Sequence, residues 1–320
     1  MTFQAKPIFP RETSRDTGFS IGRGIGISNG SDEHAPLRHL QQEIDEANAA
    51  LWCFIRADVS PHFSSALLQE VAAMQTALPR LQASRQEAGR APLRYYISGS
   101  RIPGVFNLGG DLALFMAAIR AGDRQGLRAY ARLCIEVAYN IHVAFHLPLI
   151  TISMIQGEAL GGGFEAALSA DVIIAERSAR FGLPEVLFNL FPGMGAFSFL
   201  SRRMDAARAE KMILSGRVYT AAEMHELGIV DVVAEDGFGE EAVRDYMARD
   251  QRRHNAHYAM CQARRRVNPV TFEELSDITE LWVDAALRLT ENDLRRMGRL
   301  VSAQARRQGQ AARPMQVAAE

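Results

Sequence analysis

The sequence is poor in cysteine, and its three cysteines show no spacing that would join them. Cys53, Cys134 and Cys261 lie far apart, without a Cys-x-x-Cys pair or a Cys/His pattern, so neither a disulfide framework nor a zinc site is indicated. An excess of charge of one sign is also absent, since 36 Lys and Arg residues face 37 Asp and Glu residues. We therefore expect a protein of the reducing cytoplasm, with no metal site and no nucleic acid partner attracted by overall charge.

Long hydrophobic runs are missing as well. The sequence contains no uninterrupted apolar stretch of about 18 residues, and its first residues, MTFQAKPIFPRETSRDTG, contain no apolar segment of signal-peptide length. We expect no membrane insertion and no export. Hydrophobic residues still make up 48% of the 320-residue chain, which is enough for a substantial core.

The N-terminal residues 1–45 are polar and rich in Gly, Ser and Arg, without a sustained hydrophobic period. We predict a partly ordered arm that lies mostly outside the core. The segment GRGIGISNG at 22–30 superficially resembles a dinucleotide-binding fingerprint. It follows no convincing strand and opens no helix, so we assign no nucleotide site to it.

From Leu51 onward, strand and helix patterns alternate, which predicts an α/β fold. A Gly turn followed by a helical period extends over 106–145. From about Phe238 to Gln304 the pattern is helical, with one long amphipathic helix expected from Ile278 to Val301, and residues 305–320 are predicted to be a flexible tail. The expected strands are LWCFIRA, PLRYYISGS, PLITISMIQG, DVIIAE and GIVDVVAE, and SPHFSSALLQEVAAMQTAL is an expected helix.

Two glycine-rich turns, FNLGGDL at 106–112 and ALGGGFE at 159–165, each lie between a strand pattern and a helix pattern. Backbone N–H groups of two such turns, if they converge, could stabilise a carbonyl oxygen that gains negative charge. The alternative is that the glycines only permit close packing of helix on strand. Asp111, directly after the first turn, is expected to cap the following helix.

Two glutamates, Glu165 and Glu185, stand in a stretch that is otherwise apolar. A carboxylate in such a setting is costly to desolvate unless it is paired or used. Glu185 follows Pro184, so an alternative interpretation is a carboxylate at the start of a helix. The spacing alone does not decide between these roles.

The segment SMIQGEALGGGFEAALSADVIIAERSARFGLPEVLFNLFPGMGAFSFL resembles the central block of the crotonase (enoyl-CoA hydratase/isomerase) superfamily, with its QG-x-ALGGG-x-E, G-x-PE and PG-x-G motifs. The similarity runs from about Leu51 to Val233. It implies an α/β fold of the crotonase, ClpP-like type: a ββα spiral over residues 46–237, and a helical region over 238–304 that assembles a homotrimer or a dimer of trimers.

Within that superfamily the chain is similar to the diffusible signal factor synthases, which make cis-2-unsaturated fatty acid quorum-sensing signals. The segments that carry this likeness are FNLGGDLALF, GGGFEAALSA, LPEVLFNLFPGMGAFSF and ITELWVDAALRL. The resemblance implies an enzyme, both lyase and hydrolase, that dehydrates a 3-hydroxyacyl chain on acyl carrier protein and hydrolyses the thioester. Two alternatives stay open: an enoyl-CoA hydratase of fatty-acid breakdown, acting on acyl-CoA, and a binding module that restrains a sensor histidine kinase.

The resemblance assigns roles to individual residues. Gly110 and Gly162 match the positions whose backbone amides form the oxyanion hole, and Glu165 and Glu185 match the two catalytic glutamates. Keeping both acids favours movement of water at the β carbon, because one group must act as base and the other as acid. Which glutamate has which role stays open. No cofactor is implied.

Two further features carry weaker expectations. Trp282 belongs to an apolar stripe with Leu281, Ala285 and Leu289, and it is expected either to contact the acyl chain or to be plain core. Five arginines lie between residues 251 and 268. They form either a solvated helix face or a docking surface for acyl carrier protein or the phosphates of coenzyme A.

Overall fold

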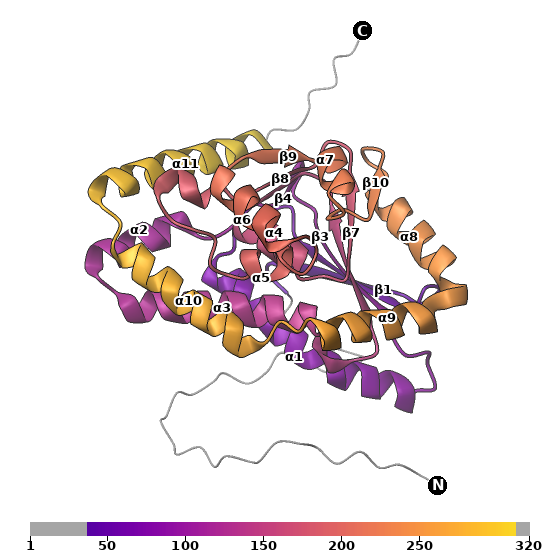
Figure 1. Ribbon diagram of the computed structural model, residues 1–320. Helices are drawn as coiled ribbons and strands as arrows, with labels where there is room; N and C mark the ends of the chain where they lie inside the picture. The colour runs from indigo at the N-terminus through magenta and orange to yellow at the C-terminus, as the bar shows by residue number, and fades with distance from the viewer. Residues whose placement is uncertain (1–36, 312–320) are drawn as a thin grey trace, which may run out of the picture.

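The computed structural model describes residues 37–311, with side chains described up to residue 302 (Figure 1). Most of the predicted N-terminal arm, the GRGIGISNG segment and the last nine residues therefore lie outside the described part. Within that part, no helix is long and apolar enough to cross a membrane. The same residues contain no cluster of His, Cys, Asp and Glu that could hold a metal ion.

A six-stranded sheet forms the centre of the molecule. All neighbouring pairs in it are parallel except the pair of β1 and β2. The strands that the sequence predicted from Leu51 onward are confirmed. In order across the sheet, the strands are β1 (Leu40–Asp45), β2 (Ala50–Ile55), β3 (Tyr95–Ser100), β5 (Ile150–Ile155), β7 (Val172–Glu176) and β10 (Val232–Ala234).

Successive side chains of these strands enter two different cores, as the two-residue period of a strand requires. On β2, Leu51 and Cys53 join the large core that contains the helices α1 (Ser65–Glu87) and α3 (Arg124–His142). Trp52 and Phe54 join a smaller core completed by α8 (Gly239–Asp250). All six residues of β2 are buried. A parallel strand covered on both faces has this near-continuous apolar sequence, which explains why LWCFIRA was recognisable.

A second, four-stranded sheet carries the glycine turns. Its strands alternate along the chain with strands of the large sheet, so β3 is followed by β4, β5 by β6 and β7 by β8, each pair leading into a helical segment. This repeated order of one strand in each sheet followed by a helical segment confirms the expected α/β fold of ββα units. In order across the sheet, the strands are β4 (Val105–Asn107), β6 (Glu158–Leu160), β8 (Arg180–Gly182) and β9 (Val218–Thr220).

The helices of the spiral are mostly those expected, but the pattern at 106–145 divides into a strand and two helices. The break falls at Gly122, which ends α2 with a φ of 64°, and Asp123 then caps α3. The helices of this region are α1 (Ser65–Glu87), α2 (Leu112–Ala121), α3 (Arg124–His142), α4 (Gly162–Leu168), α5 (Ala196–Leu200), α6 (Ala206–Ser215) and α7 (Ala221–Glu226). Two 3₁₀ turns, η1 (Ala144–His146) and η2 (Pro184–Phe188), accompany them.

The C-terminal region is helical as predicted, but the single helix expected over 278–301 is wrong. The chain breaks after α10, and Thr290 starts the next helix by accepting a bond from the Asp293 amide and donating one (2.7 Å) to the Asp293 carboxylate. The last helix continues to Ala311, so residues 305–311 of the predicted tail are helical. The elements are α8 (Gly239–Asp250), η3 (Gln251–Arg253), α9 (His254–Val267), α10 (Phe272–Leu287) and α11 (Glu291–Ala311).

The apolar stripe on α10 faces the chain's own core. Trp282 is 1% exposed, and α10 lies alongside α3 (Figure 1), whereas the neighbouring Leu281 is 61% exposed. Of the stripe that suggested assembly, Trp282 is buried, Ala285 and Leu289 are half-buried, and Leu281 is exposed, so one chain covers the stripe only in part.

The boundary placed between arm and core at residue 45 is also corrected. Strand β1 is the antiparallel edge of the large sheet, and Leu40 in it is buried. The Glu70 carboxylate on α1 accepts the amides of Arg38, His39 and Leu40 at 2.9–3.1 Å. An edge strand with few inward side chains has a polar composition, so its sequence resembles an arm.

Candidate active site

The two glycine turns predicted from the sequence lie side by side. A β-carbon built on Gly162 would lie 3.6 Å from the amide nitrogen of Gly110, and one built on Gly109 would lie 3.0 Å from that of Gly162. Gly110 directly precedes the cap of α2, and Gly162 is the first residue of α4. Neither amide donates a hydrogen bond to another residue of the described part. Two unused amides therefore lie close together, and both glycines line the same cavity.

The packing role of these glycines is real as well. A β-carbon on Gly163 would lie 2.1 Å from the carbonyl oxygen of Asn107, and one on Gly110 would lie 2.7 Å from the ring of Phe115. Gly109 has a φ of +93°, which disfavours any side chain. The two interpretations of the glycine turns are thus not exclusive, because close packing is what brings the amides together.

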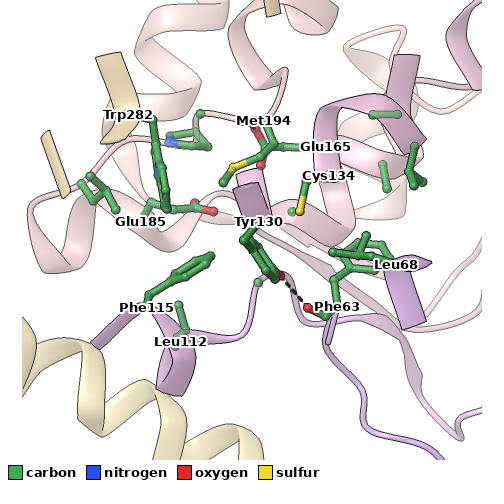
Figure 2. A pocket seen from close by; sticks show the side chains of 18 of the residues that line it. Phe63, Leu68, Leu112, Phe115, Tyr130, Cys134, Glu165, Glu185, Met194 and Trp282 are labelled. Carbon is green, nitrogen blue, oxygen red and sulfur yellow. Dashed lines mark hydrogen bonds between the residues drawn. The ribbon is translucent and has the colours of Figure 1, made fainter. Parts of the chain in front are cut away.

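A small apolar cavity of about 50 Å³ is lined by Gly110 and Gly162. Figure 2 shows the side chains that surround it. Trp282 and Phe115 form one side of it, and Phe63 and Leu68 form the other. The polar side-chain groups that line the cavity are mainly the carboxyl groups of Glu165 and Glu185. The remaining lining residues that matter for its shape are Leu112, Tyr130, Cys134, Phe188, Leu190 and Met194.

Glu165 lies in the first turn of α4 and is 2% exposed. Its Oε1 atom accepts hydrogen bonds from the amides of Met194 (2.8 Å), in the loop before α5, and Ala196 (3.0 Å), the first residue of α5. Burial raises the pKa of Glu165 to about 7, and the two amide donors oppose that rise. The loop thus favours the ionised form of this carboxyl.

Glu185 lies in the 3₁₀ turn η2, directly after Pro184. It therefore does begin a short helical turn, as the alternative interpretation proposed, but its side chain also enters the cavity. Its Oε2 atom is buried without a hydrogen-bond partner. Burial, and then the charge of Glu165, raise the pKa of Glu185 to about 8. Because only Glu165 accepts two backbone amides, ionisation is easier at Glu165 than at Glu185.

Asp111 caps α2, as expected, by accepting the amide of Leu114 at 3.0 Å. Tyr130, which the sequence did not single out, holds the same turn from α3. Its hydroxyl donates to the carbonyl oxygen of Phe63 (2.5 Å, dashed in Figure 2) and accepts from the Asp111 amide (3.2 Å). Tyr130 thereby joins the loop before α1 to the turn that carries Gly110. A buried tyrosine needs such partners for its hydroxyl, but the sequence pattern does not name them.

Trp282 comes from α10, far from the other site residues in sequence. Its ring contacts Phe115 edge to face, with centroids 5.1 Å apart. A β-carbon on Gly193 would lie 2.4 Å from that of Trp282, so the indole packs directly on the loop that precedes Met194. The residue is therefore core and cavity wall at once, and its contact with an acyl chain stays a prediction.

Comparisons with known proteins agree with this architecture. A family model described as Enoyl-CoA hydratase/isomerase matches residues 96–300. A probable enoyl-CoA hydratase of Rhizobium meliloti is 45% identical over 93 residues, which are 29% of this chain and 36% of that protein. The mitochondrial methylglutaconyl-CoA hydratase of Rattus norvegicus is 29% identical over 218 residues, 68% of this chain and 64% of that protein. The matches span about a third of the length of the first curated relatives.

Solved structures show the same fold. Pseudomonas aeruginosa DspI has a TM-score of 0.61 and 24% identity, covering 76% of this chain and 93% of that one. The human mitochondrial delta3-delta2-enoyl-CoA isomerase has a TM-score of 0.68 and 17% identity, covering 84% and 99%. With the ββα spiral, the paired turns and a family match over most of the spiral and the C-terminal helices, the chain belongs to the enoyl-CoA hydratase/isomerase family.

Proposed function

We propose that this protein adds water to, or removes it from, the C2–C3 bond of an acyl thioester. The observation that carries the proposal is the pair of buried carboxyls, Glu165 and Glu185, in unequal environments beside the two unused amides of Gly110 and Gly162. One carboxyl is ionised and its neighbour protonated, which provides a base and an acid in one cavity.

In the hydration direction, ionised Glu165 takes a proton from water as the water oxygen bonds to C3. The electrons of the double bond move toward the carbonyl, whose oxygen becomes an enolate held by the Gly110 and Gly162 amides. Glu185 then gives its proton to C2. Dehydration is the reverse and starts from the opposite distribution of the proton. Ionised Glu185 takes the C2 proton, and protonated Glu165 gives its proton to the departing hydroxyl. Each oxyanion donor is worth about 3 kcal/mol of barrier.

We further propose that the substrate is a 3-hydroxyacyl chain on acyl carrier protein. Dehydration releases one water and hydrolysis of the thioester consumes one, so the net products are a free cis-2-enoic acid and the carrier thiol. The resemblance to the diffusible signal factor synthases supports this finer proposal. The cavity suits the hydrolytic step, because water activated by Glu165 could attack the carbonyl carbon while the same amides stabilise the tetrahedral oxyanion. The protein would then make a cis-2-unsaturated quorum-sensing signal.

An ordinary enoyl-CoA hydratase is the second candidate. It is favoured by the similar proteins of Rhizobium meliloti and Rattus norvegicus, which are named as hydratases of coenzyme A thioesters. It shares all four site residues. It differs in leaving its product on the carrier, and this difference makes the two candidates separable. A protein that only restrains a sensor kinase would need neither glutamate.

The deciding experiment gives the purified protein a medium-chain 3-hydroxyacyl carrier protein, with no metal or nucleotide added, and identifies the products by mass spectrometry. Free cis-2-enoic acid supports a signal synthase. A product that stays esterified, or is purely trans, supports the hydratase. Binding without turnover supports the kinase-restraining role, and a Glu165→Gln, Glu185→Gln double variant provides the blank.

We also propose that the chain assembles as a homotrimer or a dimer of trimers. Large apolar side chains that remain exposed on the C-terminal helices support assembly, namely Met260 (66%), Val267 (85%) and Leu281 (61%). Sedimentation should give a multiple of 35.4 kDa. A monomer alone at micromolar concentration would overturn the proposal.

A further inference from the structure

The first glycine turn contains three consecutive backbone amides, those of Gly109, Gly110 and Asp111. Within the described part of the chain, only the middle amide has no acceptor. The Gly109 amide donates to Oδ1 of Asn107 at 2.8 Å, and the Asp111 amide donates to the Tyr130 hydroxyl at 3.2 Å. Two side chains therefore hold the amides on either side of the one that is left for a ligand.

Gly109 is necessary in this turn, but it does not by itself fix the direction of the next amide. Its φ is +93°, and a β-carbon on it would lie 2.9 Å from the carbonyl oxygen of Leu160. A glycine that satisfies these constraints can also adopt many other backbone conformations. The direction of the Gly110 N–H must therefore be set by the atoms that hold the neighbouring peptide groups.

Two hydrogen bonds hold the peptide groups on both sides of the Gly109 α-carbon. The Gly109 carbonyl oxygen accepts the amide of Phe63 at 2.8 Å. Because this peptide bond is trans, the Gly110 N–H in the same peptide group points in the opposite direction. The preceding peptide group is held by Asn107 through the Gly109 amide. Without Asn107, that preceding group would lose its side-chain acceptor.

Asn107 is the last residue of β4 and is completely buried. It pairs with Ala159 of β6, the strand that leads into the second glycine turn. Its Nδ2 atom is buried and has no acceptor in the described structure. A buried donor without a partner lowers stability, so filling space in the core does not explain an asparagine here. The bond from the Gly109 amide to Oδ1 does explain it, as a side chain that accepts the amide two residues ahead.

We propose that Asn107 is a positioning residue for the first oxyanion donor. By holding the Gly109 amide, it keeps the Gly110 N–H directed at the thioester oxygen, which gains negative charge during the reaction. Such a donor is effective only when it is oriented in advance. Asn107 is not among the residues that line the cavity, so it acts through the turn and does not touch the substrate. This role rests on the proposed function.

The informative variants are Asn107→Ser and Asn107→Ala. Their side chains are almost equal in volume, so both leave a similar space in the core. Only serine can still accept the Gly109 amide, and it does so more weakly than asparagine. Gln82→Ala is the matched control, because Gln82 is also a buried amide side chain and accepts the Leu93 amide at 2.9 Å, but it does not line the cavity. Circular dichroism checks that each variant folds.

The measurement compares the binding of two pantetheine thioesters to the full chain. Acetoacetyl-pantetheine can ionise to an enolate, which is detected by its near-ultraviolet absorbance and carries negative charge on the thioester oxygen. Butyryl-pantetheine has the same number of acyl carbons and stays neutral. The ratio of the two affinities reports how well the site stabilises the charge, and a loss of stability alone does not change this ratio.

We expect Asn107→Ala to lower the affinity ratio about tenfold, because its Gly110 amide is no longer held in place. Asn107→Ser should lower it about threefold, since its hydroxyl holds the Gly109 amide more weakly. Gln82→Ala should leave the ratio unchanged. In turnover, kcat of the two Asn107 variants should fall in the same order, with KM nearly unchanged.

An unchanged ratio in Asn107→Ala would overturn the role of Asn107, and so would equal losses in Asn107→Ala and Asn107→Ser. Neither result would affect the proposed function. A wild-type chain that binds no enolate would contradict the proposed function itself, and the role of Asn107 with it. If Asn107→Ala does not fold, Asn107→Ser decides alone, because a ratio equal to that of wild type would then overturn the role.

Discussion

The carboxyl group of Glu185 occupies the space that a side chain at residue 161 would need. A β-carbon on Gly161 would lie 2.6 Å from Oε1 of Glu185, and Gly161 itself has a φ of +52° and a ψ of −128°. The glycine directly before α4 therefore admits the second acid to the cavity while it also turns the chain into the helix that carries the first.

Gly161→Ala should displace Glu185 and lower kcat at least about tenfold, because small misplacements of an acid or base are expensive. It should also lose about 1–3 kcal/mol of stability through backbone strain. Gly122→Ala is the matched control, since Gly122 also has a positive φ (+64°) but has no atom within 4 Å of its built β-carbon. It should lose stability and keep its kcat. Equal activity loss in both variants would contradict the displacement argument.

Replacing either acid by its amide should abolish most of the turnover. Glu165→Gln and Glu185→Gln each keep the shape of the side chain but cannot exchange a proton, so each should cost about 10²-fold or more in kcat. Circular dichroism should not change. Glu210→Gln, at an exposed acid on α6, is the control and should be fully active. Near wild-type dehydration by either site variant would refute the two-acid mechanism.

Activity should have a bell-shaped dependence on pH. Hydration needs Glu165 ionised, with a pKa raised to about 7, and Glu185 protonated, with a pKa raised to about 8. The value of kcat/KM should therefore rise as the pH passes the lower pKa and fall as the pH passes the higher pKa, with its maximum between them. A flat profile between pH 6 and 9 would contradict this assignment.

The two raised pKa values also determine in which direction the stability of the protein changes with pH. In the folded state the pKa values of Glu165 and Glu185 both lie above the ordinary value of 4.5. The contribution of these two carboxyl groups to the free energy of unfolding is therefore fully present below pH 4.5. It is lost as the pH rises through the folded values, because ionisation must then occur in a buried site. Thermal unfolding should show Glu185→Gln gaining stability relative to wild type as the pH rises from 5 to 9. A constant difference would show that Glu185 is not buried in this way.

Tyr130→Phe should lower kcat about tenfold and leave KM nearly unchanged, because the ring stays while the turn carrying Gly110 loses its bond to the loop at Phe63. Stability should fall by about 1 kcal/mol. Tyr139→Phe is the control on the same helix, since its ring packs on Phe272, outside the catalytic cavity. A Tyr130→Phe effect on stability alone would mean that Tyr130 supports the fold and not the oxyanion turn.

Trp282→Leu should enlarge the cavity and shift the preferred substrates toward longer or branched acyl chains. Stability should fall by about 2–3 kcal/mol, as for other large-to-small core changes. Trp52→Leu removes an equally buried tryptophan from the separate core next to α8, so it should lose stability without a change in chain-length preference. A set of acyl thioesters of graded length provides the measurement.

Much of this fold and site could be predicted from the sequence because the informative features are local. Parallel strands such as β5 are short apolar runs, and the glycine turns stand at strand ends, where their spacing is visible. The resemblance singled out Gly110, Gly162, Glu165 and Glu185, and the structure places all four at one cavity.

The rest depends on contacts between distant segments. No local pattern pairs Tyr130 with Asp111 or places Trp282 over the loop at Gly193. The break before Thr290 was hidden because the apolar period continues on both sides of it, and only the pairing of Thr290 with Asp293 marks a new start. Strand β1 was missed because an edge strand buries few side chains. Which acid is ionised required the amides of Met194 and Ala196, 29 and 31 residues beyond Glu165.

Helix α4 fixes the distance between the proposed oxyanion donor Gly162 and the base Glu165, because both lie in its first turn. A single residue inserted between them would rotate Glu165 by about 100° around the helix axis and direct it away from the cavity. Related chains can therefore vary the walls at Phe188 or Trp282 to accept new substrates, but they cannot change the length of this segment. Insertions and deletions in this family should be found in the loops that surround α4 and not within its first turn.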